Sequence, residues 1–196
     1  SEVSGLNHII NELDGVFYGN GHKISNLTLT GGKGSSKYSD GGFVTEYVDT
    51  ALIGKLKGTV CDLILDNYSV TSGINNYNCV GSVAAEVPEG SIAKIDNCIV
   101  NGTISGDTYA SSTFIGGIVG MTNGSVDNNT EITINNCVSN VKLTGGKSNY
   151  VGGLIGSAQF ICKVIISKDA VIGDFSGSSH TAGGLIGYIS STDVEL

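Results

Sequence analysis

The chain of 196 residues contains no tryptophan and no arginine, and it has one proline, Pro88. With proline nearly absent and no three-residue glycine period, a collagen-like helix is excluded. Ten basic residues against 18 acidic ones give a formal net charge of −8, which argues against nucleic acid as a partner because such binding needs clustered cations. No apolar run reaches the length of a membrane-spanning helix, so no membrane insertion is expected.

The residues that are abundant predict many short strands joined by turns. Glycine occurs 30 times and 40% of the residues are hydrophobic, a share that argues against disorder. Valine, isoleucine and threonine are frequent, and glycine, asparagine, serine and aspartate fill the gaps between apolar runs. No apolar series at helical spacing continues for ten residues without glycine or a β-branched cluster, so no helix is expected.

A glycine-rich phrase returns along the chain. It reads VGGLIG at Val151–Gly156, with relatives at Ile115–Gly120, Ala182–Gly187 and Val80–Ala85 and a degraded copy at Asp49–Gly54. The copies end 31, 35, 36 and 31 residues apart, and a period of this length indicates a repeat architecture. The glycines expected at the corners of the repeat are Gly116, Gly117, Gly120, Gly152, Gly153, Gly156, Gly183, Gly184 and Gly187. The apolar residues expected to form one internal stack are Val83, Ile118, Leu154 and Leu185.

A second phrase repeats between the first ones and contains a polar residue followed by an apolar one. The polar position holds Asn26, Asp62, Asn97 and Asn136, and the apolar position holds Leu27, Leu63, Cys98, Cys137 and, in a weaker copy, Val164. Side-chain amides stacked in successive coils can bond along the axis as a ladder. Such a column is expected at a bend, because asparagine tolerates left-handed backbone angles.

Together the two phrases predict an all-β fold, a parallel β-solenoid with repeats of roughly 31–36 residues and about three short strands per coil. We expect one repeat domain over residues 1–196, with an opening motif at about 17–30 and repeats ending near residues 54, 85, 120, 156 and 187. Unpaired end coils invite aggregation, so we expect the chain to be a segment of a longer protein or to have its ends covered by a partner.

Two segments resemble a known family of repeats. Val151–Gly156 and Ala182–Gly187 resemble the GLUG motif, and Phe17–Leu27 resembles the F-x-G-N-G-H-x-I-x-N-L segment that precedes such repeats in large bacterial surface proteins. Similar repeats occur in adhesin-like proteins of gut bacteria and in the non-catalytic region of IgA-cleaving metallopeptidases. The resemblance, which extends from about Phe17 to Tyr188, implies a right-handed parallel β-helix that is secreted or displayed on the cell surface. It supplies no ligand and no catalytic residues.

The residues that could carry chemistry are scattered. His8, His22 and His180 lack neighbours at metal-ligand spacing, and we expect His22 to shape the opening turn. The acidic residues considered for a sugar-cleaving site do not converge. Asp62 is the one acid in the asparagine column and has no acidic neighbour in it, and the others lie in separate turns: Asp40, Asp107, Asp127 and Asp174. A calcium site at 123–131 is conceivable from Asp127, Asn128, Asn129 and Glu131, although a solvated loop is the favoured interpretation. We therefore predict no catalytic residue, no cofactor and no metal.

The five cysteines, an odd number, are Cys61, Cys79, Cys98, Cys137 and Cys162. Cys98 and Cys137 share a column, and the spacing of adjacent coils would permit a disulfide. Stacked side chains point in parallel, however, so we favour reduced thiols packed as small hydrophobic residues.

The leading functional hypothesis is a non-enzymatic extracellular structural or binding module of a bacterial cell-surface protein, such as an adhesin. Binding to a host glycan or protein is expected in loops that break the period, at 31–42 with Tyr38, at 73–77 with Tyr77 and at 106–112 with Tyr109. The same tyrosines could instead pack over the coil edge. The alternative is a carbohydrate-active β-helix or the accessory region of a surface metallopeptidase.

Overall fold

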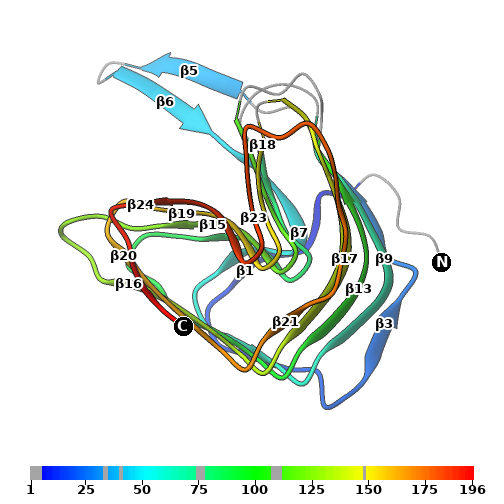
Figure 1. Ribbon diagram of the computed structural model, residues 1–196. Coiled ribbons are helices and arrows are strands. Elements are labelled where there is room, and N and C mark those ends of the chain that lie inside the picture. Colours follow the sequence, from blue (N-terminus) through cyan, green and yellow to red (C-terminus); the bar gives the residue numbers. More distant parts are fainter. Residues whose placement is uncertain (1–5, 33–34, 40–41, 74–77, 107–111, 148) are drawn as a thin grey trace.

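The computed structural model describes residues 6–32, 35–39, 42–73, 78–106, 112–147 and 149–196, and these contain strands and turns but no helix. The strands pair in parallel from coil to coil, with one antiparallel hairpin, and form the β-solenoid that the sequence predicts (Figure 1). Each complete coil has four strands rather than three, because the glycine-rich phrase is a corner between two strands. Gly117 and Ile118, for example, separate β14 (Thr113–Gly116) from β15 (Val119–Asn123).

The largest sheet has ten strands in two stacks that share β7 (Val48–Leu56). We call the first the Phe114 stack; beside β14 and the start of β7 it contains β10 (Asn78–Val80), β18 (Asn149–Gly152) and β23 (Thr181–Gly183). We call the second the Met121 stack; beside β15 and the end of β7 it contains β1 (His8–Leu13), β11 (Ala84–Val87), β19 (Ile155–Gln159) and β24 (Ile186–Ser190). Figure 1 shows the two stacks meeting at an angle, which makes the cross-section of the solenoid concave on this side.

Two further sheets close the coil. The six-stranded sheet contains β2 (Val16–Tyr18), β8 (Thr59–Cys61), β12 (Ile92–Asp96), β16 (Thr130–Asn135), β20 (Cys162–Ser167) and β25 (Asp193–Glu195). The seven-stranded sheet contains β3 (Lys23–Ser25), β4 (Thr28–Thr30), β9 (Ile64–Thr71), β13 (Ile99–Ser105), β17 (Val138–Gly145), β21 (Ala170–Val171) and β22 (Phe175–Gly177). The antiparallel hairpin of β5 (Ser35–Ser39) and β6 (Gly42–Glu46) projects from the solenoid (Figure 1).

The strand register reproduces the spacing of the glycine-rich phrase. Ile53 pairs with Ala84, Ala84 with Val119, Val119 with Ile155 and Ile155 with Ile186. The degraded first copy is one residue shorter than predicted, since Thr50 rather than Asp49 pairs with Val80.

The predicted internal stack is confirmed. Val83 donates to the carbonyl of Ile118, Ile118 to that of Leu154, and Leu154 to that of Leu185, over 2.9–3.0 Å. The first three side chains are fully buried, whereas Leu185, which lies in the last coil, is half-buried.

The glycines of the phrase are required by the close approach of backbones. A Cβ added at Gly120 would lie 2.5 Å from the nitrogen of Val80, and one added at Gly116 would meet the carbonyl oxygen of Val119. None of the nine corner glycines has a left-handed φ, so packing rather than backbone conformation demands the missing side chain.

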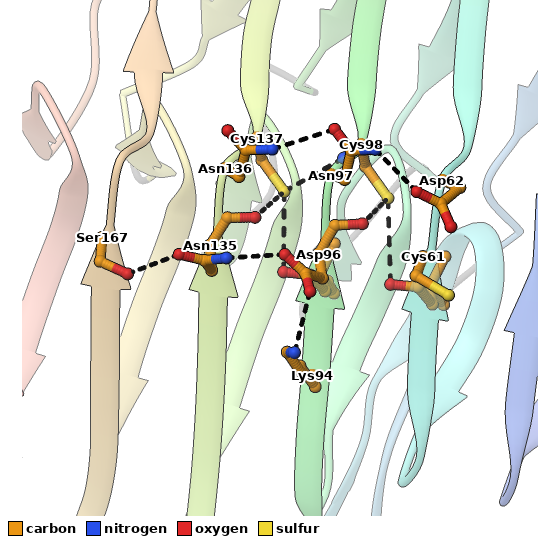
Figure 2. Close-up of polar contacts among 12 residues, drawn as sticks. Cys61, Asp62, Lys94, Asp96, Asn97, Cys98, Asn135, Asn136, Cys137 and Ser167 are labelled. Carbon is orange, nitrogen blue, oxygen red and sulfur yellow. Dashed lines mark hydrogen bonds and ion pairs between the residues drawn. The ribbon is translucent and has the colours of Figure 1, made fainter. Parts of the chain in front are cut away.

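The asparagine ladder is confirmed in three successive coils (Figure 2). The amide of Asn97 donates to Asp62 over 2.7 Å, and that of Asn136 donates to Asn97 over 3.0 Å. All three residues have left-handed backbone angles, as Lys168 does in the next coil. A second ladder that the sequence reading missed runs beside it, from Asp96 to Asn135 to Ser167 (Figure 2).

Three members of the predicted columns, Asn26, Leu27 and Val164, are wrong. Ile24 pairs with Leu65, so Asn26 lies opposite Asn67, whose amide donates to it over 2.7 Å. The reason is that Phe17 rather than Ile24 pairs with Val60. The chain has therefore already turned the corner opposite Asp62 before it reaches Ile24.

The same correction applies to the weaker fifth copy. Val164 pairs with Ile132, and the strand β20 continues to Ser167, which pairs with Asn135. Leu27, likewise, does not share the column of Leu63, because the next residue, Thr28, pairs with Ser69.

All five cysteines are free thiols, and four of them are buried. The thiols of Cys98 and Cys137 donate to backbone carbonyls of their own coil and of the preceding coil (Figure 2). Burial raises the pKa of the thiols of Cys61, Cys79 and Cys162.

We therefore expect a thiol reagent to modify native protein slowly, at half-buried Cys61 alone, because only a thiolate attacks the reagent. After denaturation without reductant, the same reagent should count five thiols. A lower count would show that a pair such as Cys98 and Cys137 is oxidised.

Candidate functional site

The tyrosine loops proposed from the sequence receive no structural test. Tyr77 and Tyr109 lie outside the described residues. Tyr38 is in β5, where the backbone of the hairpin is described but the side chains are not. The three tyrosines therefore stay predictions.

A different group of residues gathers where the two stacks of the ten-stranded sheet meet. Between their outer faces lies a second apolar cluster, separate from the core of the solenoid, which we call the outer cluster. It consists of Ala51, Cys79, Ala85, Phe114 and Met121, with Tyr47 and Tyr150 packed against it.

Strand register explains how these residues converge. One column of the Phe114 stack runs through Asp49, Cys79, Phe114, Tyr150 and Thr181. One column of the Met121 stack runs through Glu12, Lys55, Glu86, Met121, Ser157 and Tyr188. With the first copy taken to begin at Thr50, the first column holds the residue immediately before each phrase, and the second holds the residue immediately after it. The outer cluster fills the space between the columns.

In the C-terminal coils, the side chains between the two stacks are aromatic. The ring of Tyr150 lies 5.2 Å from that of Phe114 and 5.1 Å from that of Tyr188, measured between centroids. The imidazole of His180 meets Tyr150 edge-on at 5.3 Å. Phe114 is buried, Tyr150 is half-buried, and Tyr188 and His180 are exposed, so the aromatic column emerges at the surface.

In the N-terminal coils, the side chains between the two stacks are charged. Lys55 lies 3.9 Å from the carboxylate of Glu86, and Asp49 is in the facing column. Burial raises the pKa of the Asp49 carboxyl to about 7; the charge of Glu86 adds to this effect and Lys55 opposes it. Burial also raises the pKa of Glu86, again against Lys55. The Oδ1 atom of Asp49 is buried and has no hydrogen-bond partner among the described residues.

The sequence reading did not pick out Asp49 and Glu86, the two carboxylates that converge. Aligning Thr50 with Val80 would have placed Asp49 in the column of Phe114 and Tyr150. The degraded phrase hid this alignment.

The three histidines lie apart, as the sequence suggested. His22 is exposed, and its backbone N–H closes the opening turn by donating to Gly19 over 2.8 Å. His8 is half-buried on β1, at the N-terminal coil. His180 alone joins a cluster, through its contact with Tyr150.

The loop considered for calcium is tied to the preceding coil. Ser125 and Asn128 both donate to the carboxylate of Glu89, and these bonds lower the pKa of Glu89. In the described part of the chain, no group of three His, Cys, Asp or Glu side chains is placed to hold a metal ion. Beside this loop, Val126, Phe160 and Ile161 form an exposed apolar patch.

Comparison of the chain with protein-family models, curated proteins and solved structures gives no match. The likeness to GLUG repeats therefore rests on the residues quoted above. Within the described ranges there is no helix that could cross a membrane.

Proposed function

We propose that this chain is a non-enzymatic extracellular structural and binding module of a bacterial cell-surface protein, of the kind found in adhesins. The observation that carries the proposal is the solenoid itself: successive coils repeat the same columns, and the distinctive side chains lie on its concave outer side. Resemblance to surface-protein repeats supports the extracellular location, and the acidic composition is compatible with it.

The binding surface in this proposal is the exposed end of the aromatic column, formed by Tyr150, Tyr188 and His180. Tyrosine offers a flat apolar ring with a polar hydroxyl, which suits both sugar stacking and contact with a protein. Two rings held 5.1 Å apart on a rigid scaffold present such a platform with little loss of side-chain freedom on binding. A host glycan or protein is the partner class that we propose, in agreement with the hypothesis from the sequence.

Binding to a glycan array and to host extracellular proteins tests this surface. Replacing Tyr188 by alanine should weaken a detected interaction about tenfold, since loss of a contributing aromatic contact costs more than about 1 kcal/mol. The matched control is Tyr18→Ala on β2, which removes an exposed tyrosine from another sheet and should leave binding unchanged. Equal losses in the two variants would contradict this location, and the variants Tyr38→Ala, Tyr77→Ala and Tyr109→Ala would then test the loops.

One observation favours the second candidate, a carbohydrate-active β-helix. Asp49 and Glu86 lie in facing columns, and a carboxyl with a pKa of about 7 is protonated often enough to serve as a general acid. Such an enzyme would release reducing ends from polysaccharides, and both Asp49→Asn and Glu86→Gln would abolish the release. The other form of this alternative, an accessory region of a surface metallopeptidase, requires a zinc-protease domain in the same full-length protein.

A further inference from the structure

The exposed apolar patch of Val126, Phe160 and Ile161 lies on the side of the solenoid, where the Met121 stack turns into the six-stranded sheet. All three side chains are at least half exposed. Phe160 and Ile161 form the corner between β19 and β20, and Val126 lies in the loop between β15 and β16, which extends outward here (Figure 1). The backbone N–H groups of Phe160 and Ile161 donate to Ser190 and Ser191, so the next coil is already stacked on this corner and the exposure of the patch is lateral.

The backbone of this corner is strained. Phe160 and Ile161 both have a φ of +57°, in the left-handed region. Among the described non-glycine residues with positive φ, Ile161 alone is β-branched and Phe160 alone is aromatic, whereas half of them are asparagine. Left-handed angles are costly for bulky side chains, and asparagine or glycine would adopt them at less cost. Folding therefore does not explain two large, exposed apolar side chains at these positions, whereas contact with a partner would.

Two hollows adjoin at Ile161. The first, of about 330 Å³, is lined by the three side chains of the apolar patch. The second, of about 340 Å³, lies on the outer face of the six-stranded sheet and contains Glu131, Lys163 and Asp193, which pair in register in successive coils. The ammonium of Lys163 lies 3.1 Å from the carboxylate of Glu195, so the carboxylates of Glu131 and Asp193 leave this second hollow negative. We call it the acidic hollow.

The corner between the two hollows is held by the coils on both sides. Gly124 of the preceding coil donates to Gln159 over 3.0 Å, and a Cβ on Gly124 would collide with the carbonyl oxygens of Phe160 and Ile161. On the other side, Ile161 donates to Ser191 over 2.7 Å. A surface fixed in this way loses little backbone freedom when a partner binds.

We propose that the apolar patch and the acidic hollow form a docking site for a segment of another protein, one that carries a large apolar side chain next to a lysine or arginine. The apolar side chain packs between Val126 and Phe160, and the cation lies against Glu131 and Asp193. Charge complementarity selects this occupant, because a second copy with its net charge of −8 and an anionic membrane would both be repelled. The site is separate from the aromatic column, so it stands or fails independently of the function proposed above.

Fluorescence anisotropy with three short labelled peptides tests the proposal. The peptides alternate leucine with lysine, leucine with glutamate, and serine with lysine. We expect the leucine–lysine peptide to bind at least about tenfold more tightly than either of the others, and more weakly as salt screens the charges. The proposal is overturned if no peptide binds, if the three bind alike, or if phosphatidylcholine vesicles bind in place of the peptide.

A double variant, Phe160→Asn with Ile161→Gly, separates docking from folding. It should weaken binding of the leucine–lysine peptide at least about tenfold. Its equilibrium constant for unfolding should not rise, because asparagine and glycine relieve the strain of the corner. The matched control is Ile172→Asn, which removes an exposed apolar side chain between β21 and β22 and should bind like the parent.

A charge variant tests the acidic hollow. Glu131→Gln should weaken binding about threefold and reduce its salt dependence, whereas Asp174→Asn, in an exposed turn elsewhere, should change neither. Unchanged binding in the double variant overturns the proposal, and so does a rise of more than about tenfold in its unfolding constant, which would make the two residues structural. A dimer in sedimentation velocity that this variant abolishes would assign the patch to a second copy instead.

Discussion

Replacing Gly153 by alanine should destabilise the fold by about 2–3 kcal/mol, whereas the same change at Gly184 should be neutral or stabilise it by up to about 1 kcal/mol. The two glycines hold the same position in successive copies of the phrase. At Gly153 the new Cβ would lie 2.1 Å from a carbonyl oxygen and 2.6 Å from a methyl of Val171. At Gly184 it meets no described atom, and alanine only restricts the unfolded chain.

Urea unfolding followed by circular dichroism, at a concentration where the chain is monomeric, measures both variants. Ser82 holds the corresponding position in an earlier coil, so this corner can accommodate a side chain. The cost at Gly153 therefore comes from how closely the next coil approaches at that point. A cost at Gly184 equal to that at Gly153 would refute this explanation. It would show that the corner itself, not its neighbour, requires glycine.

The features visible in the sequence were those that repeat with the same chemistry. Leu154 and its equivalents are all apolar, and Asp62, Asn97 and Asn136 all carry side-chain oxygens, so a period could be read and the stacking followed. Where one copy is a residue shorter, alignment by sequence spacing failed. In the short first copy it paired Asp49 with Val80, whereas Asp49 pairs with Cys79. The opening segment failed for a related reason, because its corner takes four residues, 19–22, where the next coil uses two, Asp62 and Leu63.

The outer cluster could not be predicted by the same reading. Its first column holds a carboxylate, a thiol, two aromatic rings and a hydroxyl, which share no chemistry for a period to reveal. It becomes one surface only because the two stacks meet at an angle (Figure 1). That angle is a property of how whole sheets pack, and no single repeat encodes it.

Replacing Asp49 by asparagine should stabilise the protein at pH 8 by on the order of 2–4 kcal/mol and change little at about pH 3. The native pKa of Asp49 is about 7, well above its value in an unfolded chain. Between about pH 4 and pH 7 the native state therefore holds a proton that the unfolded chain has released. Stability contributed by this proton is fully present below about pH 4 and is lost progressively as the pH rises to about 7, and asparagine removes the dependence.

Urea unfolding of parent and variant at several pH values gives the difference directly. The matched control is Asp127→Asn, which makes the same change of charge on an exposed loop and should not alter the slope. Glu86 and Asp169, whose pKa values are also raised by burial, leave part of the slope in the variant, so the difference between the curves identifies Asp49. If parent and Asp49→Asn lose stability in parallel from pH 5 to pH 8, Asp49 is ionised in the native state. Its role as a buried acid, in stability or in catalysis, would then be excluded.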